Sequence, residues 1–206
     1  MQSNTARKKL LFIGTGGTIA SELSEGALSP ALGAEQLLRL VPDVSRMCDA
    51  DAVQLFELDS TDIMPEHWIR IADEIIRRYD DYDGFVIAHG TDTMAYTASA
   101  LSYLIQNSRK PIVLTGAQKP IGFETTDSKQ NLSDSFLCAA SGMAGVLVVF
   151  GGQVLLGTRA RKTRSKSFSA FSSPNYPPLA TVQNGRMALY FDPTEGETHF
   201  CRSLDP

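Results

Sequence analysis

Short apolar runs alternate with segments of helical periodicity along most of this chain, and this alternation constrains the fold more than any other feature. Apolar runs of this length are typical of buried parallel strands. We expect strands at residues 8–13, 52–58, 85–88, 111–114 and 145–150, and helices at residues 34–41, 65–79, 94–105 and 131–140. Strands that alternate with helices favour a parallel sheet with crossover helices. The sequence therefore predicts an α/β fold, a three-layer sandwich in which helices cover both faces of a mostly parallel sheet.

The remaining segments are less regular. Residues 21–33 show no clear period and contain two glycines and a proline, so we interpret them as a mobile loop. We expect a short strand at residues 154–156, a basic and serine-rich loop at 158–178 and a last strand at 187–191. From Asp192 the sequence is polar and resembles a linker. We therefore expect one domain at residues 1–191, followed by a tail at residues 192–206.

Composition argues against several classes of protein. The net charge of −4 offers no general attraction to nucleic acid or to an anionic membrane, so we expect neither as a partner. The first apolar run stops at Gly14 and is too short for a signal peptide or a membrane-spanning helix. Cys48, Cys138 and Cys201 are far apart and odd in number, and the three histidines do not cluster with other ligands. We therefore expect no disulfide framework, no metal site and a cytoplasmic location.

Hydroxyl-bearing turns follow four of the apolar runs. They are residues 14–18, 59–62, 89–93 and 115–118. Ligands of open α/β sheets bind beyond the carboxyl ends of the strands. Four such turns therefore predict one shared pocket for a small molecule, lined by nucleophilic and hydrogen-bonding oxygens.

The glycine-rich turn at residues 14–18 is not a nucleotide-binding loop. Ile19 occupies the position of the third glycine in the dinucleotide motif, and no lysine follows as in a phosphate-binding loop. The glycines still permit a tight turn that exposes backbone N–H groups to a ligand. A threonine in this turn is a candidate nucleophile beside an oxyanion hole. A structural turn with a threonine cap is an equally good interpretation of this motif alone.

Two further segments carry chemistry. Thr91 and Asp92 follow a predicted strand, where either side chain can cap the next helix, and the helix N-terminus can also hold a substrate carboxylate. Asp92 is alternatively an acceptor for a substrate ammonium group. The basic residues of the second segment are Arg159, Arg161, Lys162, Arg164 and Lys166. This segment can be a solvated loop, a nucleic-acid patch, or the source of a partly desolvated lysine that acts as a base.

Taken together, these turns resemble the asparaginase/glutaminase family, and the similarity is close to its cytoplasmic type I bacterial branch. Residues 15–21 resemble the first signature of the family, and residues 83–101 resemble the second almost throughout. Further motifs occur in the expected order at residues 59–62, 115–118, 161–163 and 173–176. The resemblance extends from about residue 8 to residue 191. An ordered set of motifs is far more specific than a single glycine turn.

The resemblance implies hydrolysis of L-asparagine to L-aspartate and ammonia through a covalent acyl-threonine, without cofactor or metal. It implies that Thr15 is the first nucleophile. Thr91 would be the hydroxyl of a second triad, with Lys162 as its base and Asp92 as the group that orients the lysine and accepts the substrate ammonium. The implied substrate-binding residues are Asp59, Ser60 and Thr61 at the α-carboxylate and neighbouring groups, Thr91 and Asp92, and the backbone around Gly90 and Ala117 at the developing oxyanion.

Two features depart from the family pattern. Family members usually carry a tyrosine on the loop after the first signature, whereas residues 18–59 of this chain contain none. They also carry a smaller C-terminal domain that completes the neighbouring subunit's site and builds the dimer, and this chain ends at Pro206, where that domain would begin. We therefore expect residues 1–191 to be the N-terminal catalytic domain of the family, in a natural short form or in the first half of a longer protein, and we expect a homo-oligomer.

Two alternatives stay open at this point. The same threonine, lysine and aspartate set would serve the amide-hydrolysing subunit of a tRNA-dependent amidotransferase, with the basic stretch at residues 159–166 as a candidate RNA contact. The missing tyrosine and the missing domain would also fit an inactive amino-acid-binding remnant. The choice between L-asparagine and L-glutamine as substrate stays open as well.

Overall fold

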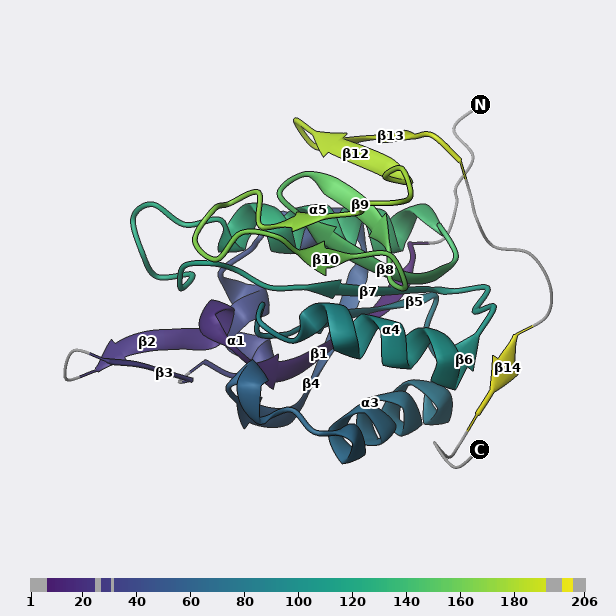
Figure 1. The fold of residues 1–206 in the computed structure, drawn as a ribbon, viewed down its shortest axis with the longest axis horizontal. Coiled ribbons are helices and arrows are strands. Elements are labelled where there is room, and N and C mark those ends of the chain that lie inside the picture. Colours follow the sequence, from purple (N-terminus) through teal and green to yellow (C-terminus); the bar gives the residue numbers. More distant parts are fainter. Residues whose placement is uncertain (1–6, 25–26, 31, 192–197, 202–206) are drawn as a thin grey trace.

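A computed structural model describes residues 7–24, 27–30, 32–191 and 198–201. Its centre is an eight-stranded sheet with the order β13-β12-β9-β8-β7-β5-β1-β4 (Figure 1). The strands of this sheet are β1 Lys9–Gly16, β4 Asp49–Leu58, β5 Gly84–Ala88, β7 Pro111–Thr115, β8 Gly145–Phe150, β9 Gln153–Leu156, β12 Ala180–Gln183 and β13 Arg186–Leu189. The first five strands are parallel, and β9, β12 and β13 are antiparallel to their neighbours. The predicted α/β class and mostly parallel sheet are confirmed.

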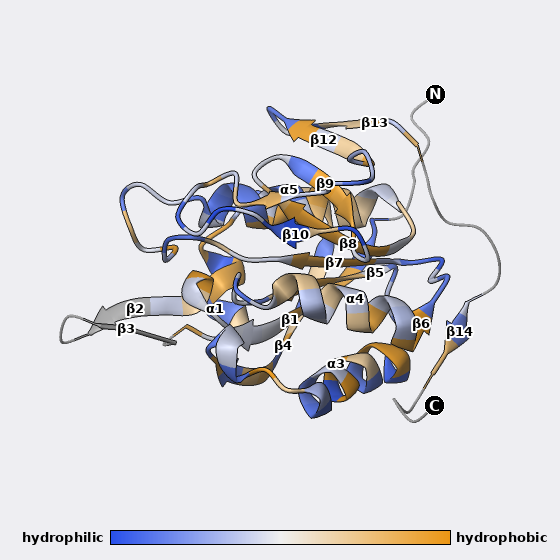
Figure 2. Ribbon diagram, viewed as in Figure 1, coloured by the Kyte–Doolittle hydropathy of each residue, from blue (hydrophilic) through white to orange (hydrophobic). Residues whose placement is uncertain are grey.

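Helices cover both faces of this sheet. The helices are α1 Ala34–Arg39, α2 Val44–Met47, α3 Pro65–Arg77, α4 Met94–Leu104 and α5 Ser128–Ser141, together with the short 3-10 turns η1 Thr18–Ala20 and η2 Ser60–Asp62. Alternate residues of β1 belong to opposite cores. Leu10 and Phe12 pack with side chains of α1, α2 and α5, whereas Leu11 and Ile13 pack with α3 and α4. This period-two alternation places apolar side chains on both faces of the central strands, and β7 and β8 are orange along most of their length (Figure 2).

The interpretation of residues 21–33 as a loop is wrong for the residues that the structure describes there. Strands β2 Ser21–Ser24 and β3 Ala27–Pro30 pair antiparallel, with Ser21 opposite Pro30 and Ser24 opposite Ala27. The hairpin projects from the body of the molecule (Figure 1). Cross-strand backbone hydrogen bonds, which need no apolar periodicity, define such a pair. Residues 25, 26 and 31 lie outside the described part of the chain.

A second hairpin, β12–β13, replaces the single strand expected at residues 187–191. Its two strands pair from Ala180 opposite Leu189 to Gln183 opposite Arg186. Asn184 and Gly185 connect them, with φ angles of 53° and 68°. Two consecutive positive φ values are characteristic of a type I′ turn, and Asn-Gly is its preferred sequence. The Asn-Gly pair was therefore the sequence signal for β12.

Two short strand pairs complete the fold. Within the predicted basic loop, β10 Arg161–Lys162 pairs antiparallel with β11 Phe171–Ser172. At the far end of α4, β6 Ile105–Gln106 pairs with β14 His199–Phe200. Most of the predicted tail at residues 192–206 lies outside the described residues, but the part that is described contacts the domain, and the Phe200 ring lies 5.1 Å from that of Tyr79. No helix in the described ranges is both long and apolar enough to cross a membrane.

Candidate active site

The four hydroxyl-bearing turns meet where the connections of the sheet diverge. Strand β1 lies between β4 and β5, so the chain leaves β1 toward one edge of the sheet and later continues from β5 toward the other. Such a switch point leaves a crevice at the carboxyl ends of the two central strands, where ligands of α/β folds bind. Thr15 belongs to the end of β1, and Thr91 lies just beyond the end of β5. The topology alone therefore brings these two threonines to the same rim.

The turns touch one another through their glycines. A Cβ atom on Gly17, whose φ is +79°, would lie 2.5 Å from the backbone of Gly90. A Cβ atom on Gly90 would lie 2.6 Å from the Cβ of Ser60. Contacts this short exclude any side chain at either position. The turns after β1 and β5 are therefore packed backbone against backbone, and the turn after β4 packs on Gly90 through Ser60.

Thr15 is anchored to the neighbouring strand. Its side chain is buried, with 1% of its surface exposed, and its Oγ1 donates a hydrogen bond to the carbonyl oxygen of Ala88 at 2.8 Å. Ala88 is the last residue of β5 and precedes the turn that contains Thr91. The hydroxyl of Thr15 is consequently fixed relative to that turn.

Thr91, Asp92 and Lys162 form one hydrogen-bonded group. The Lys162 Nζ donates to Thr91 Oγ1 at 2.8 Å and forms an ion pair with Asp92 Oδ1 at 2.6 Å. Only 16% of the Lys162 side chain is exposed, whereas 60% of the Asp92 side chain is. The pairing of β10 with β11 holds the lysine at this point, with Lys162 opposite Phe171. Because Asp92 holds the ammonium group, the lysine is aligned on the threonine hydroxyl.

A buried relay supports the turn after β5. Trp68 Nε1 donates to Thr97 Oγ1 at 3.0 Å, and Thr97 Oγ1 contacts His89 Nε2 at 2.9 Å. His89 Nδ1 lies 2.8 Å from the carbonyl oxygen of Gly90. Since a carbonyl oxygen only accepts, Nδ1 carries the proton and Nε2 accepts from Thr97. Burial lowers the pKa of His89 to about 4, so its imidazole is neutral at pH 7.

This relay determines where the N–H of Thr91 points. The Gly90 carbonyl and the Thr91 N–H belong to one peptide group, and in a trans peptide they point in opposite directions. The carbonyl faces the buried imidazole of His89. The Thr91 N–H therefore faces away from the core, where it can donate to a bound ligand.

The turn after β4 is ordered by its own acidic residue and by the turn after β5. Asp59 Oδ1 accepts from the N–H of Thr61 at 2.9 Å and from Thr61 Oγ1 at 2.7 Å. Thr93 Oγ1 donates to the carbonyl oxygen of Ser60 at 2.6 Å. Ser60 is buried and contacts Gly90, while Asp59 and Thr61 are exposed. This turn thus offers polar groups to solvent directly beside the turn of Thr91.

Ala117 is buried in the turn after β7. Its neighbour Gly116 packs against the carbonyl of His89, and a Cβ atom on Gly116 would lie 3.3 Å from Thr91 Cγ2. The structure therefore brings this fourth turn against the turn that contains Thr91. The predicted catalytic and substrate-binding residues thus lie in these four turns or, in the case of Lys162, reach Thr91 from β10, whereas Arg159, Arg161, Arg164 and Lys166 are exposed.

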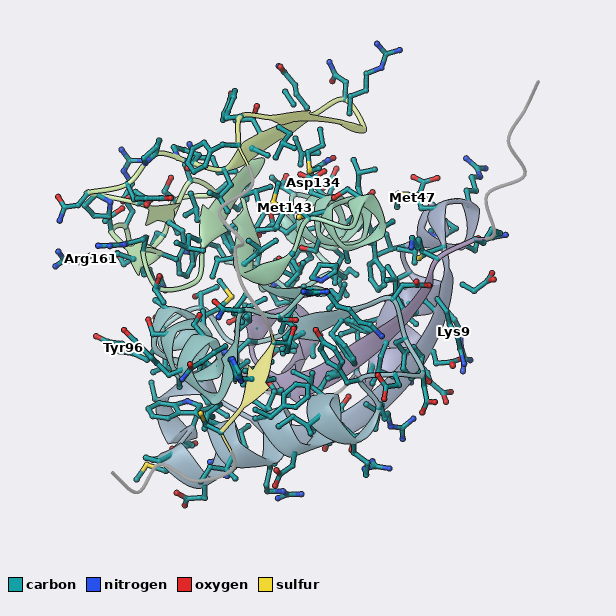
Figure 3. All side chains as sticks on the ribbon, turned by 90° about the vertical axis from the view of Figure 1, so that its right-hand side faces the viewer. Lys9, Met47, Tyr96, Asp134, Met143 and Arg161 are labelled. Carbon is teal, nitrogen blue, oxygen red and sulfur yellow. The ribbon has the colours of Figure 1, made fainter. Side chains whose placement is uncertain are left out.

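A cavity of about 480 Å³ adjoins the lysine. It is lined by Asp92, Ala95, Tyr96, Ser99, Ala160, Arg161 and Lys162. Tyr96 of α4 and Arg161 of β10 lie on the same side of the molecule (Figure 3). The part of the chain that the structure describes holds no group of three or more histidine, cysteine, aspartate or glutamate residues placed to bind a metal ion.

Sequence reasoning gave no individual role to four residues that shape the rim. They are His89, Thr93, Asp127 and Asn131, all of which bond to one of the four turns. His89 and Thr93 lie inside the motif around Thr91, but the motif does not show that Thr93 bonds to Ser60 or that His89 bonds to Thr97. Asp127 and Asn131 lie at the N-terminal end of α5, where the sequence predicts only the start of a helix.

Comparison with known proteins identifies relatives of two kinds. A family model described as "Asparaginase, N-terminal" matches residues 9–195. An L-asparaginase of Thermococcus kodakarensis is 42% identical over 202 residues, which are 96% of this chain and 61% of that protein. The structure of the thermostable L-asparaginase from that organism superposes with a TM-score of 0.88 at 41% identity, again over 96% of this chain and 61% of that one.

Two further relatives extend the comparison. The structure of a probable cytoplasmic L-asparaginase from Campylobacter jejuni superposes with a TM-score of 0.82 at 32% identity, over 90% of this chain and 58% of that one. A glutamyl-tRNA(Gln) amidotransferase subunit of Pyrococcus abyssi is 40% identical over 184 residues, which are 84% of this chain and 42% of that protein. The chain thus spans less than two thirds of the length of each of these relatives.

Proposed function

The chain belongs to the asparaginase family, and from this premise we propose that it hydrolyses the side-chain amide of L-asparagine to L-aspartate and ammonia. The observation that carries the proposal is the group formed by Thr91, Asp92 and Lys162, with 2.8 Å between the lysine nitrogen and the threonine oxygen. A threonine hydroxyl is a weak nucleophile that needs a base and an oxyanion hole. The rim supplies both kinds of group within one packed set of turns.

In the proposed first step, Thr15 Oγ1 bonds to the carbonyl carbon of the substrate amide. Its proton passes to the departing nitrogen, the carbon–nitrogen bond breaks, and ammonia leaves an acyl-threonine behind. In the second step a water molecule adds to the acyl carbon and loses a proton, and the ester bond breaks to restore Thr15. The hydroxyl of Thr91 and the amine of Lys162 relay the protons of these steps.

The neighbouring turns bind and orient the substrate in this proposal. Ser60 and Thr61 hold the α-carboxylate, and Asp59 orders Thr61. Asp92 is more than half exposed and acceptor-only, so it receives the substrate ammonium group. The backbone groups at Gly90, Thr91 and Ala117 face the oxygen on which negative charge develops. Removal of one such donor typically lowers the rate by roughly a hundred- to a thousandfold.

Ammonia release with L-asparagine and L-glutamine tests the proposal on wild-type protein and on two variants. Thr15→Ala removes the nucleophile and Lys162→Met removes the base, so each should abolish ammonia release while far-ultraviolet circular dichroism and thermal unfolding stay like those of wild type. Thr181→Ala and Lys166→Met are matched controls, because both residues lie away from the rim on β12 and in the exposed segment after β10. Near-normal turnover by Thr15→Ala or Lys162→Met would show that the roles are misassigned.

The proposal also includes the cellular location, the oligomeric state and the domain organisation of the protein. A relative carries the description "cytoplasmic", and we place this protein in the cytoplasm as a homo-oligomer. In this proposal residues 1–191 are the catalytic domain and residues 192–206 are a tail, of which His199 and Phe200 pair with β6. Sedimentation velocity together with the ammonia assay tests the oligomer, because a fully active monomer would contradict it.

A second function has its own support. The relative from Pyrococcus abyssi is an amidotransferase subunit, and Arg159, Arg161, Arg164 and Lys166 expose basic side chains in one segment. In that function the same residues would release ammonia for transfer to a charged tRNA. Turnover of free L-asparagine that does not change when tRNA is added would exclude it. Calorimetric binding of aspartate without any ammonia release would instead indicate a binding protein.

A further inference from the structure

Two buried side chains of α5 hold the turn that contains Ala117. Asn131 is 1% exposed and Asp127 is 7% exposed. Asn131 Nδ2 donates to the carbonyl oxygen of Gly116 at 3.0 Å and to Asp127 Oδ2 at 3.1 Å, while its Oδ1 accepts from the N–H of Gly151 at 3.0 Å. Both amide protons and the amide oxygen of Asn131 are engaged, so its orientation is fixed.

Asp127 serves the turn rather than its own helix. Its Oδ1 accepts from the N–H groups of Gln118 and Lys119, both at 3.1 Å, and its Oδ2 accepts from Gln118 at 3.0 Å. Asp127 occupies the N-cap position of α5, yet its side chain makes no capping hydrogen bond. Thr126 Oγ1 accepts from the N–H of Ser128 at 3.0 Å instead. A simple helix cap does not explain this carboxylate.

The hydrogen bonds of Asn131 and Asp127 hold the peptide groups on either side of Ala117. The Gly116 carbonyl shares a peptide group with the Ala117 N–H, and the Gln118 N–H shares one with the Ala117 carbonyl. The peptide bonds of the described residues are all trans, so the Ala117 N–H and carbonyl point away from Asn131 and Asp127, respectively. Within the described residues neither group has a hydrogen-bond partner, although Ala117 is only 1% exposed. Buried backbone groups are rarely left unpaired.

We infer that Asp127 and Asn131 are positioning residues for the hydrolysis: they orient both peptide groups of Ala117 toward the reacting amide. Neither side chain touches the substrate. They act through the turn, whose Gly116 packs next to Thr91. The inference rests on the proposed function and adds to it a pair of residues outside the four turns. A displacement of a binding group by about 1 Å can lower a rate a hundredfold.

Isosteric substitutions separate positioning from packing. Asn131→Asp keeps the shape of the side chain but replaces the nitrogen that donates two hydrogen bonds with one oxygen, which faces both the Gly116 carbonyl and Asp127. Asp127→Asn places an amide proton donor where three N–H groups now converge. Each variant should lower kcat about ten- to a hundredfold and change KM less than about threefold, since the turn acts mainly on the transition state. Phe136→Leu, a change in the fully buried core of the same helix, is the control for lost stability and should keep the wild-type kcat.

Amide hydrogen exchange provides a readout that does not depend on activity. The N–H groups of Gln118 and Lys119 should be protected in wild type and in Phe136→Leu, and should exchange at least about tenfold faster in the two isosteric variants. Unchanged kcat or unchanged exchange in both variants, beside an active wild type, would overturn the inference alone. A wild-type protein that releases no ammonia would overturn the proposed function, and the exchange data would then still show whether the two side chains hold the turn.

Discussion

Replacement of Asp134 by asparagine should stabilise this protein at neutral pH. Asp134 is 2% exposed on α5, and burial raises its pKa from 3.8 to about 6. The hydrogen bond that Gln130 Nε2 donates to its Oδ1 at 2.7 Å does not offset this burial. The carboxyl group of the unfolded chain loses its proton first as pH rises. Between pH 3.8 and about 6 the folded state therefore binds more protons, and stability falls with increasing pH.

The magnitude follows from this difference in pKa. Each pH unit is worth about 1.4 kcal/mol, so the buried charge costs at most about 3 kcal/mol once the pH exceeds the folded-state pKa. Asparagine keeps the oxygen that accepts from Gln130 and carries no charge. We therefore expect Asp134→Asn to raise the free energy of unfolding by up to about 3 kcal/mol at pH 7.5, which for a domain of this size corresponds to a rise in Tm of roughly 6–12 °C. The gain should disappear below pH 3.8.

Urea denaturation from pH 3.5 to pH 8 measures this difference directly, because a change in midpoint at constant slope reports stability alone. Asp73→Asn is the matched control: Asp73 is exposed on α3, and its substitution should change stability by less than about 0.5 kcal/mol at any pH. A stability gain for Asp134→Asn that is the same at pH 3.5 and pH 7.5 would refute the electrostatic argument. So would a variant that is less stable than wild type at pH 7.5.

The other predictions concern the rim and the buried histidine. Gly17→Ala should abolish ammonia release and lower stability by about 1–3 kcal/mol, since its φ is +79° and its Cβ would meet the backbone of Gly90. Gly122→Ala, where no atom lies within 4 Å of the new Cβ, should leave both quantities unchanged in the same assays. In the Asp134→Asn background, unfolding by urea should show stability falling by about 3 kcal/mol as pH decreases from 6.5 to 4, because only the unfolded imidazole of His89 is protonated in that range. A flat profile there would indicate that His89 is protonated in the folded state.

The sheet and the two opposed cores could be predicted from the sequence because each rests on a local signal. Consecutive apolar residues mark the strand that contains Thr15, and a proline at the first helical position marks the helix that begins at Pro65. The hairpin at residues 21–30 carries no such periodicity, and its strands are defined by backbone pairing. The β12–β13 hairpin did carry a signal, Asn184-Gly185, but its strands are too short to show a period.

The site residues also differ in how far the sequence predicts their positions. Thr15 and Thr91 lie where the sheet must place them, because both follow strands that are hydrogen-bonded neighbours. Lys162 has no such constraint in the sequence: it lies among several basic residues, and only the two-residue pairing of β10 with β11 selects it. Its contact with Thr91 joins residues 71 positions apart. Asp127 and Asn131 are harder still to identify from the sequence, because apart from each other their partners are backbone groups, which are the same at every position. A sequence can therefore mark the residues that carry side-chain chemistry, while those that act by orienting a peptide group are found only in the folded chain.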